Sequence, residues 1–76
     1  MITAYIFIQF GSKDPVEVIK AIRKVEGVKQ AHVVTGPADI IAFIEAEDME
    51  KLELVVSKIR KMAVITSSDT RITWSI

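Results

Sequence analysis

The sequence predicts one α+β domain of 76 residues, in which a four-stranded antiparallel sheet carries two helices on a single face. Three observations lead to this fold class. Ala4–Phe10 and Asp39–Glu45 are apolar on both strand faces, each is followed by a capped helix pattern, and the two halves of the chain match one another. A strand that is apolar on both faces needs a cover on each side.

An internal repeat gives the element order. An offset of 34 residues places Ile6 on Ile40, and the same offset places Asp14 on Asp48. Each half therefore reads as strand, helix, strand, and the whole chain reads as βαββαβ.

Both predicted helices have a clear start signal. Asp14 before Pro15 and Glu17 has the form of a capping box, and Asp48 takes the corresponding place in the second half. Gly27 supplies the left-handed conformation that ends the first helix. Apolar residues at helical spacing form one stripe on each helix: Val18, Ile19, Ile22 and Val25, then Leu52, Val55, Val56, Ile59 and Met62.

The remaining strands are expected at Gln30–Thr35 and Thr70–Ile76, and Gly36-Pro37-Ala38 is expected to form a tight link into the third strand. The order βαββαβ is that of a ferredoxin-like fold. Right-handed crossovers then place the first and third strands in the centre of the sheet. These are the two strands that are apolar on both faces.

The central strands offer two different layers. The aliphatic layer is expected beneath the helices, whereas the aromatic layer faces outward and contains Tyr5, Phe7, Ile41 and Phe43. Each aromatic side chain buries about 150–250 Å² when covered. Left bare, the layer would match the roughly 300–600 Å² of the largest apolar patch on a typical monomer. We therefore expect a second copy of the chain to pack on it in a sheet-to-sheet dimer.

Three loops are predicted to emerge at one end of the sheet, because the first and second strands run in one direction and the third and fourth in the other. They span residues 11–14, 36–39 and 65–70. Their small, hydroxyl and carboxylate residues suit a zwitterion. Asp39 would meet an ammonium group, while loop amides and the hydroxyls of Ser67, Ser68 and Thr70 would meet a carboxylate. Turn chemistry alone also favours these residue types, so both interpretations stay open.

Composition argues against several classes of function. Ten basic residues balance ten acidic ones, which argues against a nucleic-acid surface. The chain has no cysteine, one histidine and no calcium-loop pattern, so no metal and no cofactor is expected. No apolar run approaches the roughly 18 residues of a membrane span and no leader pattern opens the chain, so we expect a soluble cytoplasmic protein. The absence of asparagine is typical of a hot habitat.

Five stretches, spread over nearly the whole chain, keep a characteristic order and spacing: Ala4–Phe10, Val16–Val28, Val33–Ile40, Asp48–Leu52 and Ser68–Ile72. With them the chain resembles the effector-binding (RAM) domain of the leucine-responsive and asparagine (Lrp/AsnC) regulators of bacteria and archaea. The glycine-x-x-aspartate hairpin of that family matches at Gly36 and Asp39. Its Thr-x-Thr matches at Thr70, with Ser68 in the first place, and Ala38 stands where a tyrosine is more common.

The resemblance implies a fold of the dimeric α+β-barrel type, face-to-face sheet dimers that assemble into rings, and an amino-acid effector bound near the hairpin. The implied binding residues are Gly36, Pro37, Ala38, Asp39, Ser67, Ser68 and Thr70. Family members usually begin with a helix-turn-helix domain, whereas this chain starts at its first strand, so it resembles a stand-alone RAM domain over residues 1–76. It would then modulate transcription or metabolism without contacting DNA or a membrane, and full-length Lrp/AsnC regulators are a further expected partner.

Two other functions stay open from the sequence. Small dimeric α+β-barrel enzymes share this chain order, and His32, at a half-buried position on an edge strand, is the one candidate for a catalytic base. ACT-like amino-acid modules also share the order but pair their sheets edge to edge. Trp74 is expected in the core or in an interface. The neutral charge and the matching hairpin favour an effector-binding module that is not an enzyme.

Overall fold

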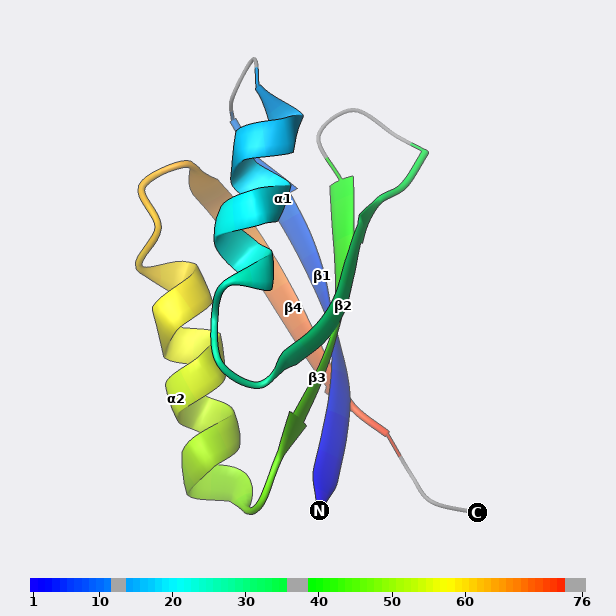
Figure 1. Cartoon of the computed structure of the whole chain (residues 1–76), viewed down its shortest axis with the longest axis vertical. Helices are drawn as coiled ribbons and strands as arrows, with labels where there is room; N and C mark the ends of the chain where they lie inside the picture. The colour runs from blue at the N-terminus through cyan, green and yellow to red at the C-terminus, as the bar shows by residue number, and fades with distance from the viewer. Residues whose placement is uncertain (12–13, 36–38, 74–76) are drawn as a thin grey trace.

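The computed structural model describes residues 1–11, 14–35 and 39–73. One four-stranded antiparallel sheet has the strand order β2-β3-β1-β4, so β1 and β3 are central as predicted. The ferredoxin-like α+β fold is thereby confirmed (Figure 1). The elements in chain order are β1 (Ile2–Phe10), α1 (Pro15–Arg23), β2 (Val28–Val33), β3 (Asp39–Ala46), α2 (Met49–Arg60) and β4 (Ile65–Ile72).

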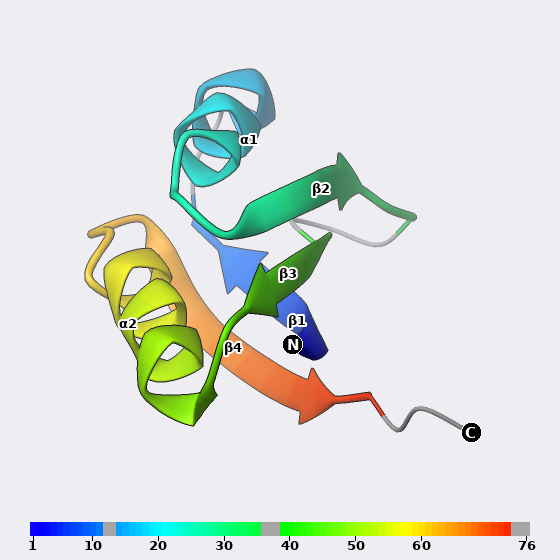
Figure 2. The ribbon, with the colours of Figure 1, turned by 60° about the horizontal axis from the view of Figure 1, so that its bottom comes forward.

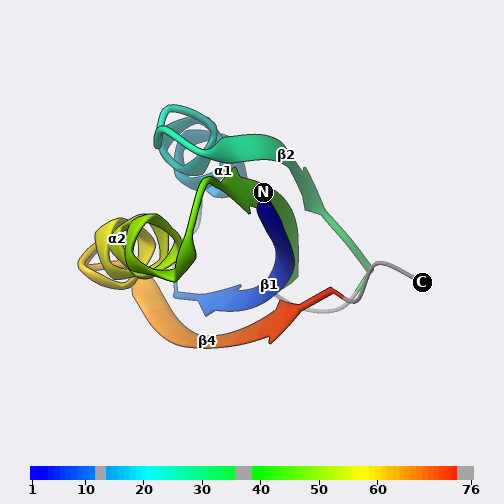
Figure 3. The same cartoon turned by 90° about the horizontal axis from the view of Figure 1, so that it is seen from below.

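Both helices lie on one side of the sheet and leave the other side uncovered (Figures 2 and 3). Burial alternates along β1, where Ile6 and Ile8 are buried while Tyr5 and Phe7 are exposed. This alternation follows from the period of two in a strand. The predicted division of the central strands into a covered aliphatic layer and an outward aromatic layer is confirmed.

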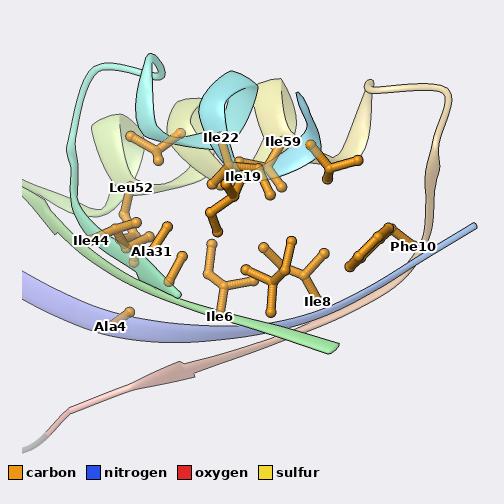
Figure 4. Close-up of a cluster of buried hydrophobic side chains, with 14 of the residues drawn as sticks. Ala4, Ile6, Ile8, Phe10, Ile19, Ile22, Ala31, Ile44, Leu52 and Ile59 are labelled. Atoms are coloured by element: carbon orange, nitrogen blue, oxygen red, sulfur yellow. The ribbon is translucent and has the colours of Figure 1, made fainter. Parts of the chain in front are cut away.

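The covered layer and the two helix stripes form one apolar core (Figure 4). Ile6 from β1 and Ile44 from β3 meet Ile22 of α1 and Ile59 of α2, and none of these four side chains retains measurable exposure. All buried side chains within the described residues are apolar. The layer between sheet and helices is therefore closely packed hydrocarbon.

Each helix begins where the sequence predicts. The Asp14 carboxylate accepts a hydrogen bond from the backbone N–H of Glu17 at 3.2 Å. The Asp48 carboxylate accepts one from the N–H of Lys51 at 2.9 Å. Each carboxylate thus satisfies a first-turn amide that has no partner within its helix. No helix in the described part of the chain is long and apolar enough to cross a membrane.

The turn from α1 into β2 depends on Gly27. Its φ of 100° lies in the left-handed region, which residues other than glycine rarely adopt. The Gly27 carbonyl also accepts a hydrogen bond from the Glu45 N–H at 2.9 Å, which ties the turn to β3. Arg23 closes the same corner, since its Nε and Nη2 atoms donate to the Ala31 carbonyl at 3.0 and 2.7 Å.

Strand β4 begins at Ile65, five residues before the predicted Thr70, so the loop predicted over residues 65–70 is wrong. The serine, threonine and aspartate of this segment suggest a turn, yet β-branched residues such as Ile65 and Thr66 also suit a strand. The ladder with β1 contains one irregularity, because Gln9 pairs with Ser67 while Phe10 pairs with Ile65. Thr66 is the extra residue of a bulge.

Strand β2 spans Val28–Val33, two residues earlier at both ends than the predicted Gln30–Thr35. The tight turn at Gly27 lets the chain enter the sheet at once. A second irregularity lies here, since Val28 pairs with Ile44 and Gln30 with Phe43, which leaves Lys29 as the extra residue. Trp74, predicted in the last strand, lies outside the described residues.

The prediction that strand ends meet at one end of the sheet is confirmed. Gln9, near the end of β1, pairs with Asp39 at the start of β3, and Phe10 pairs with Ile65 at the start of β4. The Gly11 N–H donates to the Val64 carbonyl at 2.9 Å at the same end. The ends of β1 and β2 and the starts of β3 and β4 therefore share one end of the sheet, the upper end in Figure 1.

Replacing Gly27 with alanine is expected to destabilise the protein strongly. A Cβ atom at Gly27 would lie 2.7 Å from Val55 Cγ2 and 3.2 Å from the Glu45 carbonyl oxygen. The backbone conformation costs about 1–2 kcal/mol, and the crowding costs about 1–3 kcal/mol more. Urea unfolding at a fixed chain concentration measures the loss.

The matched control for that change is Gly11→Ala. Its Cβ atom would meet only Thr66 Cγ2, at an ordinary 3.6 Å, and its φ is not in the left-handed region. We expect Gly11→Ala to change the free energy of unfolding by much less. Equal losses in the two variants would contradict the role assigned to the Gly27 conformation.

Replacing Asp48 with alanine removes the cap of α2 and is expected to cost about 1 kcal/mol of unfolding free energy. Asparagine caps about as well as aspartate, so Asp48→Asn should retain most of that stability. The same urea titrations compare the two variants. A loss of the same size in Asp48→Asn would show that the hydrogen bond to Lys51 is not the cause.

Candidate functional site

A row of polar side chains crosses three strands at the upper end of the sheet. Gln9 on β1 lies between Asp39 on β3 and Ser67 on β4 in the strand register. Paired residues point to the same side of a sheet, and Gln9 is exposed on the side that the helices leave uncovered. Asp39, Gln9 and Ser67 therefore stand side by side on the outward face.

These residues line a hollow of about 390 Å³ that we call the outer pocket. Phe7 and Ile41, paired in the register, supply its apolar part. The Ser67 hydroxyl donates to Gln9 Oε1 at 3.0 Å across the pocket. The pocket therefore combines a carboxylate, an amide and a hydroxyl with an apolar wall.

Asp69 also lines the outer pocket, but its carboxylate is already paired. Arg71 Nη2 lies 3.0 Å from Asp69 Oδ2, and Arg71 Nε donates to the same oxygen at 3.1 Å. The Arg71 guanidinium also lies 5.5 Å from the centre of the Phe7 ring, within the range of a cation–π contact. Among the described residues Asp39 makes no ion pair, so it carries the uncompensated negative charge of the pocket.

The structure brings together only part of the predicted binding residues. Asp39, Ser67 and Ser68 line the outer pocket, whereas Gly36, Pro37 and Ala38 lie outside the described residues. Thr70 pairs with Ile6 and therefore faces the helices. Ser68 and Thr70 thus belong to a strand, and both line a second hollow on the helix side, which Thr70 does not share with the outer pocket.

The second hollow lies between α2 and β4 and measures about 710 Å³. Ser68, Thr70 and Ile72 line it from β4, and Arg60 and Lys61 lie at the end of α2. It is larger than the outer pocket but does not include Asp39. The second hollow has carboxylates and cations of its own, from Glu53, Arg60 and Lys61, whereas the outer pocket combines the Asp39 carboxylate with uncharged polar groups.

The rest of the outward face is apolar. Tyr5 and Phe43 are paired in the register and their ring centres lie 5.0 Å apart. Tyr5 and Phe7 remain 45% and 42% exposed, and Ile41 and Phe43 are half-buried. The four residues predicted to meet a second copy are thus on the uncovered side, where such a contact would bury them.

His32 does not lie at a half-buried position as predicted, because it is exposed on β2 opposite Ile41. The His32 ring is in solvent because β2 is an edge strand and no helix covers its outer side. His32 lines neither of the two hollows described above. The enzyme hypothesis also required a polar group in a cavity beneath the sheet, where the buried side chains of the described residues are all apolar.

Sequence reasoning missed Gln9, Phe7 and Ile41 as pocket residues. Gln9 stands within an otherwise apolar strand pattern, although its spacing of two from Phe7 places both on the same face. The row through Asp39 follows from the β1–β3 register, which the repeat in the sequence could have suggested. The row through Ser67 depends on the bulge at Thr66, for which the sequence has no glycine or proline signal.

Comparison with known proteins supports a regulatory ligand-binding role. The family model described as the Lrp/AsnC ligand binding domain matches residues 3–76, and this description points away from catalysis. No curated protein matches the chain closely enough to count as a relative.

Solved structures show the same fold over the whole chain. The hypothetical protein PHS023 from Pyrococcus horikoshii has a TM-score of 0.88 and 31% identity, with 100% of this chain and 93% of that chain covered. TTHA0845 from Thermus thermophilus has a TM-score of 0.87 and 26% identity, with 100% and 96% covered.

A third structure is the transcriptional regulator NMB0573 from Neisseria meningitidis in complex with L-Met. Its TM-score is 0.82, with 97% of this chain and 50% of that chain covered, so the present chain spans about half of the regulator. At 18% identity this similarity shows the fold alone. The family match over almost the full chain, together with the architecture, leads to one conclusion: the protein belongs to the Lrp/AsnC ligand binding domain family.

Proposed function

We propose that this chain is an effector-binding regulatory module that takes up an amino acid in the outer pocket. The observation that carries the proposal is the row of Asp39, Gln9 and Ser67 beside an apolar wall. Membership of a ligand-binding family supports it, as does the L-Met complex of the regulator that shares its fold.

The chemistry of the pocket matches the parts of an amino acid. The Asp39 carboxylate, which makes no ion pair among the described residues, attracts an ammonium group. Phe7 and Ile41 offer an apolar contact for a side chain such as that of methionine or leucine. The Ser67 hydroxyl, which donates to Gln9 Oε1, and the Gln9 amide give the same hollow its uncharged polar groups.

We further propose that a second copy of the chain covers the outward face. Tyr5, Phe7, Ile41 and Phe43 present the apolar centre of this face, and Asp69 and Arg71 lie at its β4 side. An apolar centre with a polar rim is the usual composition of a protein interface. Larger assemblies would form from such dimers.

The same module would act on transcription or metabolism through protein partners, with full-length Lrp/AsnC regulators as candidates. Its ten basic and ten acidic residues give no net charge, which disfavours direct DNA binding. A cytoplasmic location fits this role. Residues 1–76 would form the single ligand-binding unit.

Calorimetry with a panel of the natural amino acids tests the effector site. We expect one or a few apolar amino acids to bind, and Asp39→Asn to weaken that binding at least tenfold, because the variant loses the charge that pairs with the ammonium group. Glu45→Gln makes the same chemical change on the outward face of β3 at the far end of the strand, so it should bind normally. If no amino acid binds to the unaltered protein, the effector proposal is wrong.

Phe7→Asp should abolish face-to-face association, because it places a charge in the apolar centre of the outward face. Light scattering is expected to show a monomer, whereas Val16→Asp, at a site on α1 that is 54% exposed, should leave the assembly intact. Phe43→Asp should behave like Phe7→Asp. An unchanged assembly in both outward-face variants would instead favour the edge-to-edge pairing of ACT-like modules.

A further inference from the structure

Gln9 is the central member of the polar row, and the role inferred for it rests on the proposed effector site. We infer that Gln9, held by Ser67, is the residue that selects an α-amino acid over the corresponding amine, because its amide N–H groups meet the ligand carboxylate while Asp39 meets the ammonium group. In the prediction from the sequence, hydroxyls and loop amides bind the ligand carboxylate instead.

The position of Gln9 supports this role. Asp39 and Gln9 face each other on adjacent strands, and adjacent strands lie about 4.7–4.9 Å apart. The ammonium and carboxylate groups of an α-amino acid are attached to one carbon atom, so they need an acceptor and a donor at close spacing. The Asp39–Gln9 pair supplies both. Asp39 and Ser67 lie farther apart, because β1 runs between their strands.

The hydrogen bond from Ser67 fixes which end of the amide a ligand meets. The Ser67 hydroxyl donates to Gln9 Oε1 at 3.0 Å, so the amide oxygen is already engaged. A primary amide has two N–H donors, and among the described residues those of Gln9 make no hydrogen bond. Ser67 is thus a positioning residue that leaves Gln9 to act as a donor.

The charges around the pocket make a neutral donor important. Within the part of the chain that the structure describes, Arg71 is the cation near the pocket, and it is engaged by Asp69 at 3.0 Å and by the Phe7 ring at 5.5 Å. Asp39 attracts any amine, with or without a carboxylate on the same carbon. Discrimination in favour of the amino acid therefore has to come from groups that bind the carboxylate, and among the described residues Gln9 is the amide donor paired with Asp39.

Calorimetry with two matched pairs tests this inference: L-methionine against 3-(methylthio)propylamine, and L-leucine against 3-methylbutylamine. The unaltered protein should prefer the amino acid at least tenfold. Gln9→Glu keeps an acceptor for the Ser67 hydroxyl but replaces the N–H donors with a second negative charge. We expect it to lose amino-acid affinity at least tenfold and to bind the amine more tightly.

Two further variants separate this effect from general damage. Gln9→Met retains the length of the side chain without donor or charge, so it should lose amino-acid affinity and gain none for the amine. Gln30→Glu makes the charge change on the outward face beside Phe43, outside the pocket, and should leave the preference intact.

The outcomes also separate the two proposals. Amino-acid binding that Gln9→Glu and Gln9→Met leave unchanged would overturn the role of Gln9 while the effector site stands. Failure of the unaltered protein to bind any amino acid of the natural panel would overturn the effector site and this inference together. Equal losses in Gln9→Glu and Gln30→Glu would show a general charge effect and would also overturn the inference.

Discussion

The rest of the structure depends on the burial of β1 and β3 beneath the two helices. These strands are apolar on both faces, and two helices can cover only one face of a four-stranded sheet. The aliphatic layer takes the covered side, where Ile6 and Ile44 are fully buried. Alternation along the strands then leaves Tyr5, Phe7 and Phe43 on the other side. The apolar surface available for association is thus a direct result of how the core is filled.

The same alternation positions the polar residues of the outer pocket. Gln9 follows Phe7 by two positions on β1, so it must share the outward face, and the register brings Asp39 beside it. The pocket is consequently built on strands whose inner sides are packed in the core, so the proposed effector would meet groups that need little reorganisation. Its apolar wall is part of the outward face proposed for association, because Phe7 and Ile41 belong to both.

The fold could be predicted from the sequence because the patterns that indicate its strands and helices are strong and local. Continuous apolar runs identified the central strands, and the aspartates at positions 14 and 48 identified the helix starts. The start of β4 could not be found this way, since serine, threonine and aspartate suit both turns and exposed edge strands. The candidate site was predicted in part: Asp39 and Ser67 share the outer pocket, whereas Thr70 is turned toward the helices by a register that composition does not encode.

Side chains alternate between the two sides of β4, and the bulge at Thr66 reverses which residues point to which side. In a regular strand Ile65, Ser67 and Asp69 would all point to the same side. With one extra residue between them, Ile65 packs against the core while Ser67 reaches Gln9 on the opposite side. The apolar anchor of the strand and its pocket-lining hydroxyl can therefore vary independently, so that the chemistry of the outer pocket can diverge among related proteins while the core sequence stays the same.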